Sequence, residues 1–215
     1  MSRIIDLSQT VRHGVRGVEI EPFTHLEKDG WNSTTLKLYS HATTHMDAPR
    51  HFLPDGATME VQSLDKCLGP AWVVNVGPAA PRQLIGVEDL GAYADKIGPG
   101  DRLLVRTDWS KRLGTPQFRD ELPRISLELA EWLAAKKIAL IGVEPPSVAA
   151  VDDMDEITRV HRALLGAGIV IVEGLQNLDA LSSDRVTFVA LPLKIDGGDG
   201  VPVRAVAIEG ALEAP

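Results

Sequence analysis

The chain is poor in cysteine, in positive charge and in long apolar runs, and each shortage excludes a class of protein. Cys67 is the single cysteine among 215 residues, so no disulfide can form within the chain. The formal net charge is −8 at pH 7, which argues against a surface that follows the phosphates of nucleic acid. Apolar runs such as residues 169–172 are much shorter than the roughly 20 residues that cross a bilayer.

The first residues, Met-Ser-Arg-Ile-Ile-Asp, lack the apolar run of a signal peptide. Together with the unpaired cysteine, this predicts a cytoplasmic protein. Cys67 itself is expected to be a small core residue and not a nucleophile, because no base accompanies it in the sequence.

What the chain does contain is enough apolar sequence for one large core. It is 44% hydrophobic, and its length predicts a single domain over residues 1–215. Residues 126–137 place apolar side chains at helical spacing, and residues 138–143 follow as a near-continuous apolar strand. Helix, glycines and buried strand return in residues 158–172, and this alternation predicts the α/β fold class. Further strands are expected over residues 3–7, 71–76, 102–107, 185–193 and 203–208, with a short helix over 86–94.

Residues 41–51, His-Ala-Thr-Thr-His-Met-Asp-Ala-Pro-Arg-His, hold three imidazoles and one carboxylate. His41, His45 and Asp47 offer two nitrogen donors and one oxygen donor, a set that Zn²⁺ or Mn²⁺ accepts with positions left for water. The stretch is not a His-Glu-x-x-His helix, since threonines and a proline disfavour one. We therefore expect a loop that follows a strand over residues 34–40. A single histidine has many other roles, and the prediction of a metal rests on their density.

A second informative stretch surrounds the apolar strand at residues 169–172. Glu173 directly follows that strand, at the end where open α/β sheets present functional side chains. His161 lies in the preceding helix and is the only histidine beyond residue 51. Taken alone, His161 is explained as a half-buried helical residue and Glu173 as a solvated strand end. Their order and spacing favour a joint role.

These stretches resemble the motifs of one family. Segment 40–52 is similar to Ser-His-x-Gly-Thr-His-x-Asp-x-Pro-x-His-Phe, the signature of the cyclase family of metal-dependent hydrolases, which includes kynurenine formamidase and isatin hydrolase. Segments 161–165 and 173–178 resemble the family's His-x-x-Leu-Leu and Glu-x-Leu-x-Asn-Leu motifs. Thr43 replaces the family's glycine, so the loop's backbone is expected to differ if that glycine has a positive φ. The resemblance covers nearly the whole chain and implies a mixed β-sheet or barrel-like core flanked by helices, the swivelling β/β/α fold of kynurenine formamidase.

The resemblance also assigns roles to side chains. It implies five ligands for one or two divalent ions, zinc or manganese: His41, His45, Asp47, His161 and Glu173, with Asp47 shared. His51 resembles the family's proton donor and acceptor. A bound ion lowers the pKa of its water from about 15.7 towards roughly 7, which makes hydroxide the expected nucleophile, and a second ion would polarise the scissile carbonyl.

Together these features predict a hydrolase of a small-molecule amide, lactam or lactone. The alternatives are a metal-dependent lyase or cyclase, kynurenine formamidase itself (an arylformamidase), and a metal-stabilised binding module without turnover. Trp31 and Trp109 are candidates for substrate binding, with packing as the competing explanation. The expected assembly is a homodimer or higher homo-oligomer, with no nucleic acid or membrane as partner.

The N-terminal turn bears on the substrate. Relatives build part of an aromatic pocket wall there, whereas this chain has Arg12 and Arg16 and no aromatic residue between them. A cationic pocket edge favours a substrate that carries a carboxylate, unless both arginines are simply solvated. We therefore expect a hydrolase other than a kynurenine formamidase of the usual kind.

Overall fold

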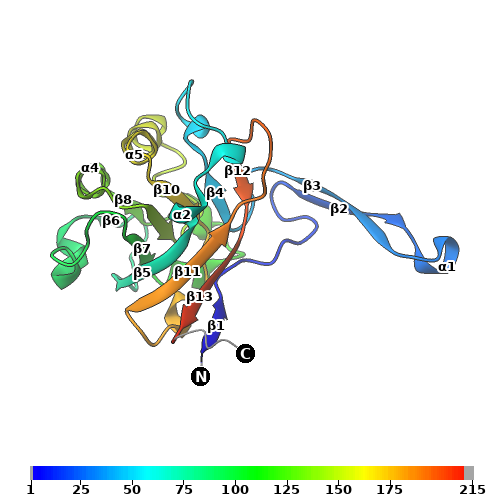
Figure 1. Cartoon of the computed structure of the whole chain (residues 1–215), viewed down its shortest axis with the longest axis horizontal. Helices are drawn as coiled ribbons and strands as arrows, with labels where there is room; N and C mark the ends of the chain where they lie inside the picture. The colour runs from blue at the N-terminus through cyan, green and yellow to red at the C-terminus, as the bar shows by residue number, and fades with distance from the viewer. Residues whose placement is uncertain (1, 211–215) are drawn as a thin grey trace.

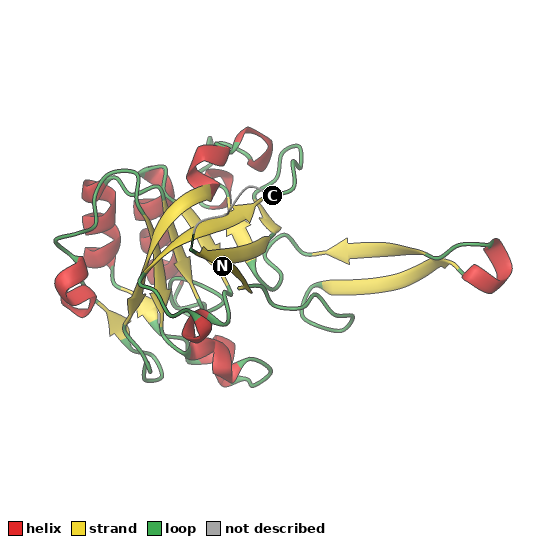
Figure 2. Ribbon diagram, turned by 60° about the horizontal axis from the view of Figure 1, so that its bottom comes forward, coloured by secondary structure: helices red, strands yellow, loops and turns green. Residues whose placement is uncertain are grey.

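A nine-stranded sheet organises this computed structural model, which describes residues 2–210 (Figure 1). The strand order is β1-β13-β11-β5-β7-β9-β10-β4-β12. The four central strands β5, β7, β9 and β10 are parallel, and the pairs towards both edges are antiparallel. The sheet is thus mixed and curls into a half-barrel (Figure 2), which confirms the predicted fold class. Its strands are β1 (Arg3–Asp6), β4 (His45–Asp47), β5 (Leu68–Asn75), β7 (Arg102–Arg106), β9 (Leu140–Val143), β10 (Val170–Glu173), β11 (Arg185–Leu191), β12 (Gly200–Pro202) and β13 (Arg204–Glu209).

The helices are few and mostly short. The two longer ones, α4 (Leu127–Lys136) and α5 (Met154–Gly166), lie side by side along one face of the sheet (Figure 1). The others are α1 (Leu26–Asp29), α2 (Leu64–Cys67) and α3 (Gln117–Asp120), and the 3₁₀ turns are η1 (Pro49–His51), η2 (Met59–Val61), η3 (Glu88–Tyr93), η4 (Trp109–Arg112) and η5 (Leu178–Ala180). Among residues 2–210, no helix is long and apolar enough to cross a membrane.

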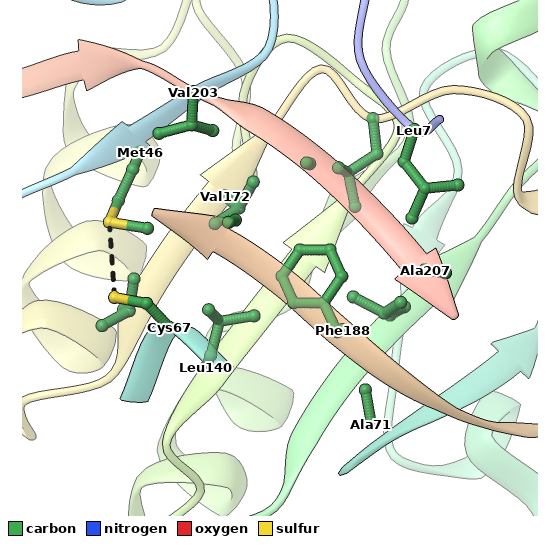
Figure 3. Packing of buried hydrophobic residues seen from close by; sticks show 14 of the residues in the cluster. Leu7, Met46, Cys67, Ala71, Leu140, Val172, Phe188, Val203 and Ala207 are labelled. Carbon is green, nitrogen blue, oxygen red and sulfur yellow. Dashed lines mark hydrogen bonds between the residues drawn. The ribbon is translucent and has the colours of Figure 1, made fainter. Parts of the chain in front are cut away.

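Both faces of the central strands are buried. In β9, Leu140 belongs to one hydrophobic cluster and Ile141 to another, as expected for side chains that alternate across a sheet. The second cluster also contains Leu133 of α4 and Leu164 of α5, so these helices cover that face. The first cluster is closed by the curled half of the sheet, where Phe188 is fully buried (Figure 3). This double burial is why residues 138–143 read as a continuous apolar run.

Cys67 confirms its predicted place in the core. Its side chain is fully buried in the first cluster, and its Sγ lies 3.9 Å from Sδ of Met46 (Figure 3). Burial raises the pKa of the Cys67 thiol to about 11. A thiol in this state is a poor nucleophile.

The helix ends follow ordinary capping chemistry. Ser126 caps α4 by accepting a hydrogen bond from the amide of Leu129 at 3.0 Å. Asp153 caps α5 by accepting from the amides of Asp155 and Glu156. The cap places the start of α5 four residues before the predicted helix at residue 158, because the polar first turn hides the helical pattern.

A two-stranded arm projects from the sheet (Figure 2). It pairs β2 (Val18–Thr24) with β3 (Ser33–Leu38), and α1 lies at its tip. The predicted strand over residues 34–40 is therefore β3, but its partner β2 was not predicted. A second two-stranded pair, β6 (Leu84–Ile85) with β8 (Arg124–Ile125), lies near α4.

Two local predictions were wrong. The loop expected over residues 41–51 contains the strand β4 and the turn η1. The helix expected over residues 86–94 is a 3₁₀ turn that is broken at Gly91, where φ is 52°. In both cases the segment is too short for the local sequence to decide, and pairing or packing with distant residues sets the conformation.

Candidate metal centre

Strand pairing brings the two predicted motifs together. β4 lies between β10 and β12, and its antiparallel register sets His45 opposite Glu173. His45 and Asp47 are two residues apart on β4, so their side chains share one face of the sheet. His161 reaches this face from α5, which packs against β10. Four of the predicted ligands therefore meet at one buried point.

The distances within this cluster are those of atoms that share a bound cation. His45 Nε2 lies 3.1 Å from Glu173 Oε2 and 3.6 Å from Asp47 Oδ1. His161 Nε2 lies 3.5 Å from Glu173 Oε1 and 3.6 Å from Asp47 Oδ2. Ligands bound tetrahedrally at about 2.0–2.2 Å from one ion are separated by roughly 3.3–3.6 Å. Each pair is spaced about as two ligands of one divalent ion are, and the pairs of Asp47 with His45 and with His161 belong to separate candidate groups of donors.

The hydrogen bonds behind the imidazoles support the same conclusion. His45 Nδ1 lies 3.0 Å from the carbonyl oxygen of Thr43, and His161 Nδ1 lies 2.7 Å from that of Ile157. A carbonyl only accepts, so each Nδ1 donates, and Nε2 is the ring nitrogen that faces the carboxylates. A positive charge, either a metal ion or a proton on Nε2, favours this arrangement. Asp47 Oδ2 is buried without a hydrogen-bond partner among the described residues, as expected of a ligand atom.

His41 extends the cluster towards solvent. Its Nδ1 lies 2.8 Å from Asp47 Oδ1, and its Nε2 lies 3.1 Å from Asp199 Oδ2. The ring of His51 stacks on that of His41, with centroids 3.9 Å apart. His51 Nδ1 is 3.9 Å from Asp199 Oδ2. His41, His45 and Asp47 can hold one ion, and His41, His51 and Asp199 form a neighbouring group of donors.

Asp199 was missed in the sequence. It lies in the glycine-rich turn over residues 196–200, which predicts a turn and no chemistry. The pairing of β12 with β4 sets Gly200 opposite Asp47 and so carries Asp199 to the site. The signal that could have identified Asp199 is an acidic residue inside a glycine-rich turn that precedes a strand.

Burial and charge act in opposite directions on the imidazoles. Burial lowers the pKa of His41, but the hydrogen bonds and charges of Asp47 and Asp199 outweigh it and raise the pKa to about 9. In His51 burial dominates and lowers the pKa below its ordinary value.

The inner residues follow the pattern of His41. Burial lowers the pKa of His45 and of His161, yet hydrogen bonding to Glu173 reverses the direction and raises both. Burial alone would raise the pKa of Glu173, but the hydrogen bonds from His161 and His45 hold it below its usual range. The site is thus strongly attractive to positive charge, whether a proton or a metal ion supplies it.

A pocket of about 370 Å³ opens above the cluster. His41, His45, His51, His161 and Glu173 all line it. Its wall carries the aromatic side chains of Tyr39, Phe52 and Phe118, and the guanidinium-bearing residues Arg16 and Arg119 also line it. The side chain of His51 is 25% exposed, whereas those of His45 and His161 are 2% exposed. The buried imidazoles and Glu173 form the floor, and His51 is accessible from the pocket.

The structure separates the two predicted tryptophans from the pocket. Trp31 is 60% exposed, follows α1 closely in the sequence and does not line the pocket of its own chain. Trp109 is 1% exposed and donates its Nε1 hydrogen to the carbonyl of Phe118 at 2.8 Å, so it supports the wall from behind. Arg16 lines the pocket as expected, but Arg12 does not. The aromatic wall exists although the N-terminal turn lacks aromatics, because residues from other parts of the fold build it.

Thr43, which stands where the family has a glycine, has a backbone conformation that is typical of glycine. Its φ is 57°, in the left-handed region. Asp108, in the turn after β7, has a φ of 57° as well. Both residues adopt a backbone conformation that glycine adopts readily.

Comparison with known proteins identifies the family of this chain. The Cyclase family model matches residues 5–150. The chain belongs to the cyclase family of metal-dependent hydrolases. It is 38% identical to the kynurenine formamidase of Salinibacter ruber over 178 residues. This alignment covers 81% of the chain and 79% of the relative. It is 32% identical to the kynurenine formamidase of Bacillus cereus, over 95% of the chain and 97% of the relative.

Solved structures of the family share the fold. Isatin hydrolase A from Ralstonia solanacearum superposes with a TM-score of 0.83 and 28% identity, covering 96% of the chain and 92% of the neighbour. A potential metal-dependent hydrolase with cyclase activity superposes with a TM-score of 0.80 and 26% identity, over 99% of the chain and all of the neighbour. These relatives confirm the predicted enzyme class, a hydrolase acting on carbon–nitrogen bonds.

Proposed function

We propose that this chain is a divalent-metal-dependent hydrolase of a small-molecule amide or lactam. The observation that carries the proposal is the buried cluster of imidazoles and carboxylates at the floor of the pocket, with Asp47 Oδ2 unpartnered among the described residues. His41, His45 and Asp47 would hold one zinc or manganese ion, and Asp47, His161 and Glu173 a second. A bound ion supplies a nucleophile at neutral pH by lowering the pKa of water, and it polarises a carbonyl.

His51 would transfer the proton in this reaction. Its imidazole is accessible from the pocket and stacks on His41, so it lies beside the donor cluster without being buried in it. An amide nitrogen leaves readily only when it is protonated, and a neutral imidazole can first accept and then deliver that proton. Asp199 lies on the side of His51 Nδ1 and would orient the ring.

The pocket lining favours an aromatic substrate that carries a negative charge. Tyr39, Phe52 and Phe118 offer aromatic contacts to a ring. Arg16 and Arg119 can bind a carboxylate through paired N–H donors. A lactone would undergo the same chemistry, since the site would bind its carbonyl in the same way.

Kynurenine formamidase activity is the second candidate. The expectation against it was based on a missing aromatic wall, and that premise is wrong for this pocket. Relatives 32–38% identical bear that name. A lyase or cyclase reaction and a binding module without turnover have no observation of their own in their favour.

We also propose that two or more copies associate through the arm. A two-stranded hairpin is marginally stable alone in water, yet this one exposes Phe23, Leu26, Trp31 and Leu36 by 57–75%. A second copy of the chain would bury these side chains. Light scattering of the wild type and of a Phe23→Ser, Trp31→Ser double variant tests this association. The cytoplasmic location stays a prediction.

The test of the activity is a screen of the metal-reconstituted protein. N-formylkynurenine, isatin, formanilide and lactones would be supplied with Zn²⁺ or Mn²⁺, and hydrolysis followed by incorporation of ¹⁸O from labelled water. Turnover without ¹⁸O in the product contradicts the hydrolase and favours a lyase. His51→Ala should lower kcat by about 10²–10⁴ while metal content is kept. His13→Ala, an exposed histidine outside the pocket lining, is the matched control.

A further inference from the structure

Thr43 has a backbone conformation that its side chain makes costly. Within residues 2–210, five non-glycine residues have a positive φ, and Thr43 is the only β-branched one. A β-branched residue in this region is a genuine outlier, because its side chain crowds the backbone. Glycine would adopt the same angles without that cost. The side chain therefore needs a reason to be there.

The conformation is imposed by the neighbours of Thr43 and not by Thr43 itself. The next residue, Thr44, is 1% exposed, and its hydroxyl donates to the carbonyl of Gly174 at 2.6 Å and accepts from the amide of Gln9 at 2.8 Å. On the other side, the amide of Ala42 bonds the carbonyl of Tyr39. The chain has to turn through Thr43 between these two anchors.

The carbonyl of Thr43 orients a ligand, and its side chain is free for another task. The carbonyl oxygen accepts from Nδ1 of His45 at 3.0 Å, and a glycine carbonyl would do the same. Thr43 lines the pocket and is half-buried. Among the described residues, its hydroxyl has no hydrogen-bond partner. The strain therefore coincides with a free polar group in the pocket, beside the donor cluster.

We propose that the Thr43 hydroxyl is a specificity-determining contact: it hydrogen-bonds a carbonyl acceptor of the substrate next to the scissile amide. This inference rests on the proposed hydrolase function. It predicts that the enzyme discriminates between amides with and without such an acceptor, and that this discrimination is separate from metal binding and from the proton transfer by His51.

Two matched substrates and three variants test the contact. Formanilide and 2′-formamidoacetophenone differ only by an acetyl group beside the formamide. The wild type should favour the acetyl compound in kcat/KM. Thr43→Ser should keep this preference, whereas Thr43→Val and Thr43→Gly should reduce it by roughly tenfold, the worth of one lost hydrogen bond in a pocket. The change should lie mainly in KM, and the metal content should stay that of the wild type.

The melting temperatures of the variants measure the backbone strain at Thr43 independently of its contact with the substrate. Thr43→Gly should raise the melting temperature by about 2–4 °C, because it relieves the left-handed conformation. Lys137→Gly is the matched control, since Lys137 has a φ of 57° at the exposed end of α4, outside the pocket lining. It should raise stability without altering substrate preference.

The outcomes distinguish this inference from the proposed function. Equal preference in the wild type, Thr43→Val and Thr43→Gly overturns the contact while leaving the hydrolase in place. If the wild type hydrolyses neither compound, nor isatin, the proposed function fails. In that case the contact is tested by the calorimetric binding of 2-aminobenzoate to the zinc-loaded protein, because this compound offers a carboxylate acceptor at the same ring position. Equal affinity of the wild type and Thr43→Val for 2-aminobenzoate overturns the contact.

Discussion

Glu144 provides the sharpest test of how the fold supports the pocket. Its carboxylate is fully buried at the end of β9. Oε2 accepts from the amide of Thr107 at 2.6 Å and from its hydroxyl at 2.9 Å, and Oε1 accepts from the hydroxyl of Ser110 at 2.7 Å. The same turn carries Trp109, which is bonded to the carbonyl of Phe118 in the pocket wall. Glu144 thus ties the turn after β7 to the next strand of the sheet.

Replacing Glu144 with alanine should destabilise the protein severely. A hydrogen bond to a charged group contributes about 1.5–3 kcal/mol, so the three bonds set an upper range of about 4.5–9 kcal/mol. Two effects reduce this loss, because the two hydroxyls can rotate to other partners and one buried charge is removed. The Thr107 amide, in contrast, stays unsatisfied. We expect a loss of about 3–5 kcal/mol in the free energy of unfolding. This lowers the melting temperature by about 10 °C in a chain of this length.

Urea unfolding and calorimetry measure this loss, and Glu144→Gln is the control. Glutamine keeps an oxygen acceptor for Thr107 and donates to Ser110, so it should lose less than half as much as alanine. The alanine variant should also have a higher KM than the glutamine variant, because the turn that supports Phe118 is released. A Glu144→Ala melting temperature within about 2 °C of the wild type would refute the reasoning.

Three further predictions concern the metal, the pocket edge and the core. Asp47→Asn should abolish the binding of about one to two divalent ions per chain, measured by elemental analysis, because the proposal places Asp47 in both ligand sets; a variant that keeps one ion where the wild type holds two would show that Asp47 is not shared. Arg16→Gln should raise KM for an acidic amide by about tenfold more than for its neutral ester, whereas Arg12→Gln, outside the pocket lining, should not. If KM changes equally for the acid and the ester in both variants, neither arginine binds the carboxylate of the substrate. Cys67 should react with an aromatic disulfide reagent at pH 8 only after unfolding, since burial raises its pKa to about 11; fast labelling of the folded protein would contradict its place in the core.

One helix, one strand and the candidate metal ligands could be predicted from local sequence patterns alone. The helix α4 was predictable because its apolar spacing and the Ser126 cap act within one or two turns of chain. β9 was predictable because burial on both faces leaves a continuous apolar run. The candidate metal ligands stood out because imidazoles and carboxylates at such density have few other uses.

Local patterns were therefore enough to predict the fold class, the position of the main helices and the chemical character of the site. Which distant residues join that site depends on the folded arrangement of the whole chain. Asp199 is separated from His41 by 158 residues and reaches it through the register of β12 on β4. Phe118 and not Trp109 forms the wall, because Trp109 is buried behind it. Strand pairing and burial are set by contacts across the whole chain, and no local pattern records them.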